Sequence, residues 1–215
     1  MIYQILYITL YCYFDMIHPH TELRFIDDEI GYGVVATRFI PKGTITWVLD
    51  KLDREFTQEQ IDSFDPLYQN ILDTYSYKNN KGNYVLCWDL GRYVNHSFNS
   101  NCLTTAYDLE IAIRDIQPGE QLTDDYGYLN INKPFRAASE GTKRKTVYPD
   151  DLLRYYKIWD KKLMTVLKYV PQVDQPLWSL VPDSSREELN RISEKPEEMI
   201  SIINCYYRSE NGKGH

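Results

Sequence analysis

The side chains that could do chemistry in this chain gather in two polar stretches. Residues 91–102 (GRYVNHSFNSNC) place amides, hydroxyls and one imidazole directly after an apolar segment. Residues 111–130 form a strand, turn and strand pattern that leads into Asp124-Asp125-Tyr126-Gly127. The first stretch is too polar for a core and presents hydrogen-bond donors and acceptors. In the second, Tyr126 is the most interesting group, although a buried phenol also serves as a packed aromatic with a satisfied hydroxyl.

A third candidate is the turn Gly31-Tyr32-Gly33, which lies between two strand-like segments. Glycine adopts positive φ at low cost, so this turn serves either the backbone conformation alone or the close approach of backbone to a ligand. The turn lacks the remaining glycine of a dinucleotide-binding fingerprint, and no helix follows it. A Rossmann interpretation therefore fails.

Other familiar kinds of site find little support. His96 and Ser97 lack an acid at a defined position, so they are poor evidence for a nucleophilic triad. Asp124 and Asp125 are adjacent, and neighbouring strand residues point to opposite faces, so they cannot form a facing acid and base pair. No Cys-x-x-Cys pair is present, and neither a zinc site nor a disulfide framework is legible. The cysteines are Cys12, Cys87, Cys102 and Cys205.

Short β elements in series are expected to position these groups. Residues 18–49 alternate strand-like runs with turns at the glycine motif and at Pro41-Lys42-Gly43. Thr57 with Gln60 predicts a capping box for a short helix, and Pro66 starts another that runs through Leu72. Residues 84–88 and 109–113 are short apolar runs typical of strands.

The sequence changes character after Phe135, where residues 136–148 contain the polar, basic run SEGTKRK and are expected to form a linker. In the region 149–215, apolar residues then recur every three or four positions, which predicts an amphipathic helix. They are Leu152, Tyr156, Trp159, Leu163, Leu167 and Val170. Ser184 or Ser185, and then Pro196, mark the starts of two further helices that end near Tyr207.

The first 17 residues form an apolar extension without a basic start or a small-residue cleavage site, so a secretory signal is not expected. Its apolar run to Phe14 would span about 21 Å as a helix, short of a bilayer core of roughly 30 Å. Two interpretations stay open. Translation starts at Met16, or the extension is a strand or helix that covers a hydrophobic face.

The charge balance disfavours direct nucleic-acid binding. The net charge is −7, with −8 in residues 18–135 and +2 in residues 136–215, whereas phosphate backbones attract basic proteins. An acidic body suits a cationic partner, and it also simply keeps a protein soluble. Isolated cysteines fit a reducing compartment, which predicts a cytoplasmic protein, with delivery to another cell or compartment left open.

Taken together and in order, three segments resemble the signature motifs of SET-domain protein lysine methyltransferases. They are Gly31-Tyr32-Gly33, Arg92-Tyr93-Val94-Asn95-His96-Ser97 and Gly119-Glu120-Gln121-Leu122-Thr123-Asp124-Asp125-Tyr126-Gly127. The resemblance covers residues 23–129. It implies a mainly β, α+β fold of small curved sheets, in which the two polar stretches meet in a knot-like crossing within a domain of residues 18–135.

The resemblance also implies S-adenosylmethionine as the cofactor and a lysine that enters a channel from the opposite face. The cofactor would be held by Gly31, Tyr32, Gly33, Arg92, Asn95 and His96. Tyr126 would be the catalytic tyrosine. The channel residues would come from Tyr75, Tyr77, Asp124 and Tyr128.

The chain departs from the family pattern in four places. Phe98 stands where a cysteine is common, and Ser100 replaces the customary proline. No cysteine-rich segment follows Gly127, so Cys102 lacks the partners with which it would bind the zinc of many relatives. We therefore predict no metal and expect the helical region 149–215 to complete the channel. Asp124 replaces an aromatic residue that influences how many methyl groups are added. It either pairs with the lysine ammonium or points to solvent.

The leading interpretation is an S-adenosylmethionine-dependent enzyme that methylates a lysine of a basic, histone-like protein, without direct binding to nucleic acid or membrane. The alternative from another class is a non-catalytic SET-like module that binds a protein. A third hypothesis is self-methylation within Lys143-Arg144-Lys145, which also reads as a solvated linker.

Overall fold

The computed structural model describes residues 17–138 and 140–208. The expectations for the N-terminal extension, for Met16 and for Cys12 fall outside the described residues.

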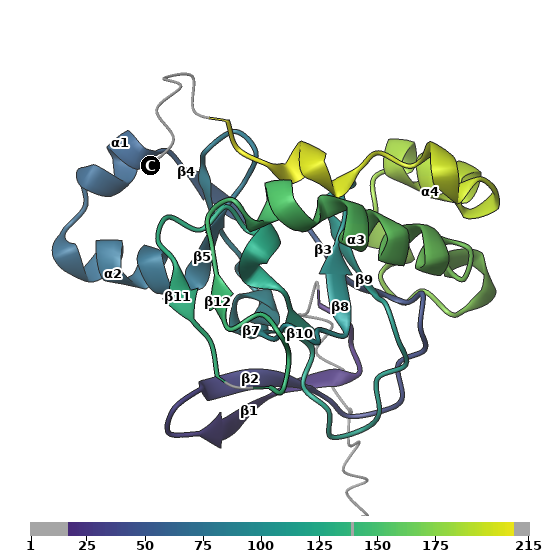
Figure 1. Ribbon diagram of the computed structural model, residues 1–215, viewed down its shortest axis with the longest axis horizontal. Helices are drawn as coiled ribbons and strands as arrows, with labels where there is room; N and C mark the ends of the chain where they lie inside the picture. The colour runs from purple at the N-terminus through teal and green to yellow at the C-terminus, as the bar shows by residue number, and fades with distance from the viewer. Residues whose placement is uncertain (1–16, 139, 209–215) are drawn as a thin grey trace, which may run out of the picture.

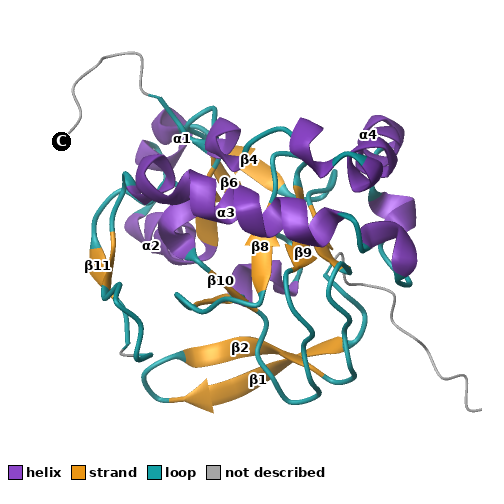
Figure 2. Ribbon diagram, turned by 45° about the vertical axis from the view of Figure 1, so that its right-hand side comes forward, coloured by secondary structure: helices purple, strands orange, loops and turns teal. Residues whose placement is uncertain are grey.

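An antiparallel hairpin carries the glycine turn at one edge of the molecule. Its strands are β1 (Thr21–Asp27) and β2 (Gly31–Ala36). Gly31 has φ +79°, a conformation that glycine adopts without a steric penalty. Backbone hydrogen bonds from Ala36 to Glu120 and from Leu122 to Val34 fasten β2 to the segment that precedes Tyr126. Figures 1 and 2 place this hairpin on the side of the molecule opposite the C-terminal helices.

Two three-stranded antiparallel sheets form the body of the fold. One has the order β3 (Ile45–Val48), β9 (Leu109–Ala112) and β8 (Cys102–Thr104). The other has the order β4 (Arg54–Phe56), β6 (Tyr84–Leu86) and β5 (Ser76–Lys78). Between β4 and β5 lie α1 (Gln58–Asp62) and α2 (Pro66–Tyr75). The predicted capping box is present, with Thr57 as the N-cap of α1, and α2 starts at Pro66 as expected.

A two-residue parallel pair brings the two polar stretches together. Its strands are β7 (Asn95–His96) and β10 (Thr123–Asp124), and Thr123 faces Asn95 while Asp124 faces His96. A 3-10 helix precedes β7 at Leu90–Tyr93, and another follows β10 at Tyr126–Tyr128. This pairing joins the two polar stretches that were expected to cross.

The C-terminal region packs helices over the β3-β9-β8 sheet (Figure 2). The predicted amphipathic helix is α3 (Asp151–Leu167), which buries Leu152, Trp159 and Leu163. The next helix, α4 (Asp183–Glu194), begins just before Ser184. After Pro196 the chain forms 3-10 turns, not an α-helix. The 3-10 helices of this region are Val170–Gln172, Trp178–Leu180, Pro196–Glu198 and Ile202–Cys205.

The segment expected to be a linker is tied down at both ends. β11 (Phe135–Arg136) pairs antiparallel with β12 (Thr146–Val147). Strands of two residues carry no periodicity, so the sequence pattern gave no signal for them.

Two hydrophobic cores hold the fold together. The larger lies between the β3-β9-β8 sheet and the C-terminal helices, where Ile111, Tyr128 and Leu163 are buried. The smaller lies under the hairpin and includes Val34 and Leu122. The predicted fold class, mainly β and α+β with small sheets and a C-terminal helical extension, is confirmed.

Candidate active site

Asn101 fixes the crossing of the two polar stretches. Its side chain is 1% exposed, its Nδ2 donates to the Gln121 carbonyl oxygen at 2.7 Å, and its Oδ1 accepts from the Thr123 backbone at 2.8 Å. A buried amide that satisfies backbone groups on the neighbouring segment holds that segment in register. The segment that leads to Tyr126 is therefore clamped from the loop that follows His96.

Tyr126 is held at this crossing by two hydrogen bonds. Its hydroxyl donates to the backbone carbonyl oxygen of Val94 at 2.6 Å, and its backbone N–H donates to Nδ1 of His96 at 3.1 Å. Burial raises the pKa of the Tyr126 phenol, and the carboxyl groups of Asp124 and Glu110 raise it further. The phenol is therefore neutral, with its proton directed at the loop that precedes Asn95.

His96 sits in an aromatic cluster with one ring nitrogen unused. Its ring centroid lies 4.5 Å from that of Phe98 and 5.4 Å from those of both Tyr126 and Phe135. Because Nδ1 accepts a hydrogen bond, the neutral ring carries its proton on Nε2. Nε2 is buried without a partner in the described residues. Burial lowers the pKa of His96, so the ring is neutral and its Nε2–H is a donor without an acceptor among the described residues.

The glycine turn contacts this region through Asn95. Asn95 Nδ2 donates to the Tyr32 carbonyl oxygen at 3.0 Å and to Gln121 Oε1 at 3.1 Å. A Cβ on Gly33 would lie 2.4 Å from Gln121 Oε1 and 2.7 Å from Asn95 Nδ2, so any other residue at this position would displace these two side-chain amides. A Cβ on Gly31 would instead meet nothing within 4 Å, which shows open space beside the turn.

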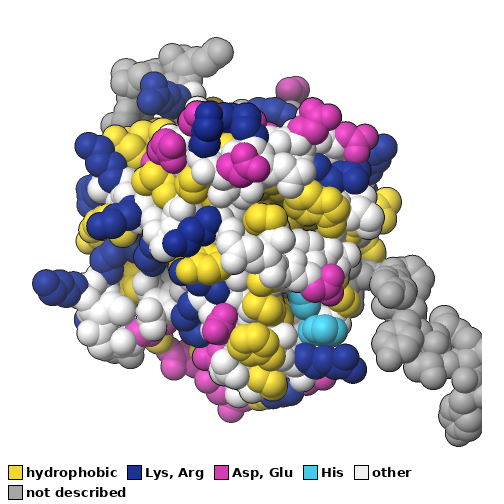
Figure 3. Space-filling view, turned by 90° about the vertical axis from the view of Figure 1, so that its right-hand side faces the viewer, with side chains coloured by type: hydrophobic (Ala, Val, Ile, Leu, Met, Phe, Trp, Pro, Cys, Tyr) yellow, Lys and Arg dark blue, Asp and Glu magenta, His cyan; other side chains and the backbone are white. Residues whose placement is uncertain are grey.

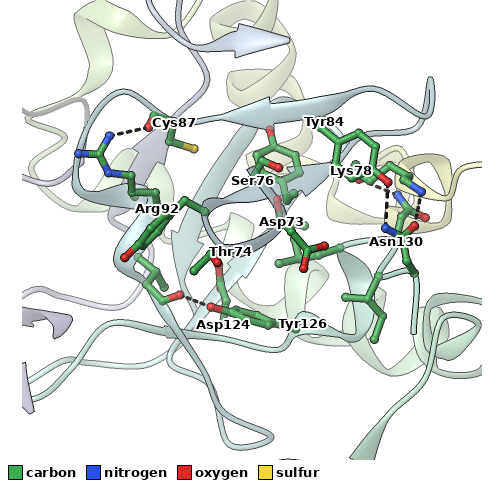
Figure 4. Close-up of a pocket in the computed structure, with 18 of the residues that line it drawn as sticks. Asp73, Thr74, Ser76, Lys78, Tyr84, Cys87, Arg92, Asp124, Tyr126 and Asn130 are labelled. Carbon is green, nitrogen blue, oxygen red and sulfur yellow. Dashed lines mark hydrogen bonds between the residues drawn. The ribbon is translucent and has the colours of Figure 1, made fainter. Parts of the chain in front are cut away.

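A cavity of about 660 Å³ opens beside Tyr126. Figure 4 shows Asp124 and Tyr126 together at one end of it, with Lys78, Tyr84 and Asn130 at another. Of the residues predicted for the site, the cavity is lined by Tyr75, Tyr77, Arg92, Asp124 and Tyr126. Trp47, Cys87 and Glu110 also line it. Its size falls within the range of small-molecule and side-chain pockets.

The other predicted site residues lie outside the lining of this cavity. The glycine turn, Asn95 and His96 are not among its lining residues; His96 accepts from the Tyr126 backbone, and Asn95 donates to the Tyr32 carbonyl oxygen. Tyr128, predicted for the channel, is 1% exposed; its hydroxyl donates to Asp124 Oδ1 at 2.6 Å and its ring packs on Trp159. It borders a second, smaller cavity of about 260 Å³.

Arg92 was predicted to contact the cofactor. In the structure its side chain is hydrogen-bonded to backbone carbonyl groups. Its guanidinium donates to the carbonyl oxygens of Cys87 and Trp88, both at 3.3 Å, and lies 5.1 Å from the centroid of the Tyr93 ring. Its side chain borders the cavity on the side of β6 (Figure 4).

Asp124 and Asp125 point to different partners, as the strand geometry predicted. Asp124 is 3% exposed and borders the cavity. Asp125 accepts a hydrogen bond from the Gly127 backbone and forms an ion pair with Arg144. Arg144 also pairs with Asp151 at the start of α3, and its guanidinium stacks over the Phe98 ring.

Glu140 makes a second link from the same loop. Its Oε2 accepts from Ser97 Oγ at 3.0 Å and from the Phe98 backbone at 2.9 Å. Sequence reasoning assigned Glu140 and Arg144 to a linker because both lie in a polar run. A carboxylate and a guanidinium that reach back to the polar stretches could not be distinguished there from solvated charges.

The C-terminal helices do not reach the larger cavity. None of its lining residues comes from α3 or α4; the wall that follows Tyr126 is built from residues 129–133 and Phe135. The C-terminal segment supports this wall from behind, because Asn130 Nδ2 donates to the Cys205 carbonyl oxygen at 2.7 Å. Asn204 and Cys205 border only the smaller cavity.

The described residues also bear on metal-binding groups, membrane-spanning helices and charged surface patches. They contain no group of three or more His, Cys, Asp or Glu side chains placed to hold a metal ion, and none of their helices is long and apolar enough to cross a membrane. Figure 3 shows basic and acidic side chains interspersed over one face.

Comparison with known proteins assigns the central part of the chain. Residues 31–127 match the family model of the SET domain, from the glycine turn to the residue after Tyr126. The chain therefore contains a SET domain at these residues. Such domains are generally those of protein lysine methyltransferases and typically bind S-adenosylmethionine. A search of curated proteins found no match.

Proposed function

We propose that this protein is an S-adenosylmethionine-dependent protein lysine methyltransferase. The observation that carries the proposal is the position of Tyr126. Its hydroxyl is fixed on the carbonyl oxygen of Val94, beside the Asn95-His96 pair, and its ring borders a cavity with aromatic walls. The phenol thus stands between the segment proposed to hold the cofactor and the cavity proposed to admit the lysine.

The residues around the glycine turn fit the cofactor. Nε2 of His96 is a buried donor without a partner, as expected where a polar ligand completes the site. Open space lies beside Gly31 and leaves room for a ligand next to the turn. Gly31, Tyr32, Gly33, Asn95 and His96 would hold the group, and Arg92 would contribute from the cavity side.

When bound, S-adenosylmethionine supplies an electrophilic methyl group on a sulfonium. The protein needs no covalent step for in-line displacement by an amine, so its task is to position the reactants and exclude water. Trp47, Tyr77 and Tyr126 line the cavity with aromatic rings that favour a cation. A free lysine has a pKa of about 10.4. The rings attract the entering ammonium, and its desolvation inside the cavity then lowers this pKa and favours loss of a proton to the nucleophilic amine.

The substrate proposed is a basic, histone-like protein. The domain of residues 18–135 carries a net charge of −8. Complementary charge speeds encounter more than it raises affinity, and salt screens it. We therefore expect methylation of such substrates to slow as ionic strength rises.

The test combines cofactor binding with transfer. Calorimetry should detect S-adenosylmethionine binding to the full chain, and labelled cofactor should transfer methyl groups to purified histones. Binding without transfer to any lysine-rich protein, or no binding by folded protein, would favour the alternative of a non-catalytic SET-like module. Mass spectrometry of the protein after incubation also tests self-methylation at Lys143 or Lys145.

A further inference from the structure

Two carboxyl groups from different strands meet at the wall of the larger cavity. Glu110 belongs to β9 and Asp124 to β10, both border the cavity, and their side chains are hydrogen-bonded to each other. Asp124 also accepts a hydrogen bond from the Tyr128 hydroxyl at 2.6 Å. The oxygen of this hydroxyl accepts from the backbone N–H of Asp125 at 3.1 Å. The sequence did not predict this pair, because Glu110 is a single charged residue within an apolar strand.

The pair carries one negative charge. Burial raises the pKa of both carboxyl groups, and the charge of Asp124 raises that of Glu110 further. Glu110 therefore keeps its proton and donates it to the Asp124 carboxylate, so the two groups titrate together. In the described residues no Lys or Arg forms an ion pair with either group, whereas neighbouring Asp125 is neutralised by Arg144.

A buried charge without a counterion is costly unless a ligand supplies one. The surroundings of the pair suit a cation on an alkyl chain. Trp47 is 5% exposed, borders the same cavity and packs edge-on against Tyr77, with ring centroids 6.3 Å apart. Aromatic walls with a carboxylate at their end bind an ammonium better than a neutral group.

We propose that Glu110 and Asp124 form the ammonium-binding end of the cavity and accept a proton from the substrate amine. This inference rests on the proposed function for its substrate, a lysine side chain. One N–H bond of the ammonium breaks, its proton forms an O–H bond with the Asp124 carboxylate, and the electron pair stays on nitrogen as the lone pair of the neutral amine. The pair returns to its starting state when one proton leaves to solvent.

The proposal also sets a preference among alkylammonium ions. A primary ammonium donates N–H bonds to the carboxylate, but a quaternary ammonium has none to donate. Each methyl group added to nitrogen removes one such bond, so the pair favours unmethylated lysine over its methylated products. Release of product after few transfers follows from the same hydrogen-bond count.

The test uses simple mimics of the lysine side chain on the full chain. Binding of n-butylammonium, butyltrimethylammonium and n-butanol is measured by calorimetry and by the fluorescence of the tryptophans. Asp124→Asn keeps the shape and a hydrogen-bonding oxygen but removes the negative charge, whereas Glu110→Gln keeps that charge and replaces the O–H donor by an amide N–H. Glu187→Gln is the matched control, because Glu187 is exposed on α4.

We expect n-butylammonium to bind the wild type and Glu187→Gln alike, more tightly than either other probe. Because a hydrogen bond to a charged group contributes about 1.5–3 kcal/mol, Asp124→Asn should lose about tenfold or more in affinity, whereas Glu110→Gln, which keeps the charge, should lose little. Circular dichroism and thermal melting establish that the variants fold. If Asp124→Asn does not fold, the wild type decides the matter, because its affinity for n-butylammonium should fall as acid protonates the Asp124 carboxylate.

Equal affinity for n-butanol and n-butylammonium, or no loss of n-butylammonium affinity in folded Asp124→Asn, would overturn the inference. This failure is distinguishable from failure of the proposed function. Methyl transfer to histones by the wild type, with unchanged n-butylammonium affinity in Asp124→Asn, removes the carboxyl pair from the site but leaves the enzyme. If Asp124→Asn loses n-butylammonium binding and the folded wild type does not bind S-adenosylmethionine, the cation site is supported and the methyltransferase is rejected.

Discussion

The hydroxyl of Tyr126 donates to the carbonyl oxygen of Val94, which lies 32 residues earlier in the chain, at 2.6 Å. This bond joins the residue just before Asn95 to the end of the segment that carries the two aspartates. It fixes the ring at the border of the cavity, and it does so without any contribution from the C-terminal helices. The same bond makes the phenol a sensitive place to test both chemistry and folding.

Tyr126→Phe should reduce methyl transfer by about 10²-fold, because small misplacement of reacting groups costs that much. It should lower the free energy of unfolding by only about 1 kcal/mol, the usual contribution of one hydrogen bond. Labelled transfer to histones and thermal melting measure the two effects. Tyr148→Phe is the control, since Tyr148 is 41% exposed, and equal labelling by all three proteins would remove Tyr126 from the mechanism.

Arg144→Met should destabilise the protein strongly. The change leaves Asp125 and Asp151, both nearly fully buried, without their shared cation, and breaking a buried pair in this way costs about 3–5 kcal/mol. Arg144→Lys should recover part of the loss, because lysine keeps the charge but lacks the forked geometry. Urea denaturation measures the difference.

The control for Arg144 is Arg154→Met. Arg154 pairs with Asp150 on the surface of α3 with half of its side chain exposed, and such pairs contribute at most about 1 kcal/mol. Similar losses for Arg144→Met and Arg154→Met would show that the buried bridge contributes no more than a surface pair.

Gly33→Ala should weaken S-adenosylmethionine binding more than Gly31→Ala does. A methyl group on Gly33 collides with Gln121 and Asn95, whereas one on Gly31 enters open space. Gly31→Ala carries a different cost, since its φ of +79° strains any other residue by about 1–2 kcal/mol. Calorimetry and thermal melting separate the two effects, and an affinity retained in Gly33→Ala would remove Asn95 from cofactor binding.

His18 should make stability depend on pH. Burial lowers its pKa from 6.5 to about 4, with His20 adding to the decrease and Asp174 opposing it. The unfolded chain therefore binds more protons than the folded one between these values, so His18 destabilises the fold as pH falls from 6.5 toward 4. The full effect is roughly 3 kcal/mol.

His18→Gln tests this dependence, because glutamine does not titrate. The difference in unfolding free energy between wild type and variant should be constant above pH 7 and should shift in favour of the variant toward pH 4. Taking the difference cancels the carboxyl groups whose pKa values are raised. A difference that stays flat from pH 7 to pH 4 would contradict the assignment.

The sequence predicted well those features that local pattern determines. The three- and four-residue spacing of Leu152, Trp159 and Leu163 led to α3, and the order of three short motifs led to the SET domain and to Tyr126. Strand alternation also predicted that Asp124 and Asp125 face different partners.

What the sequence did not predict depends on contacts between distant segments. Glu110 reads as one charge in an apolar strand until β10 brings Asp124 beside it. Glu140 and Arg144 read as solvated charges until β11 and β12 turn their loop back onto Ser97 and Asp125. No local period encodes such pairings, which only the tertiary fold creates.

The bridge from Asp125 through Arg144 to Asp151 also bears on where the working unit ends. A fragment cut after Gly127 would keep every signature motif and yet leave a buried anion next to Tyr126 with nothing to neutralise it. The smallest autonomous piece is therefore set by a counterion that lies beyond the last motif, and it extends at least to the first turn of α3.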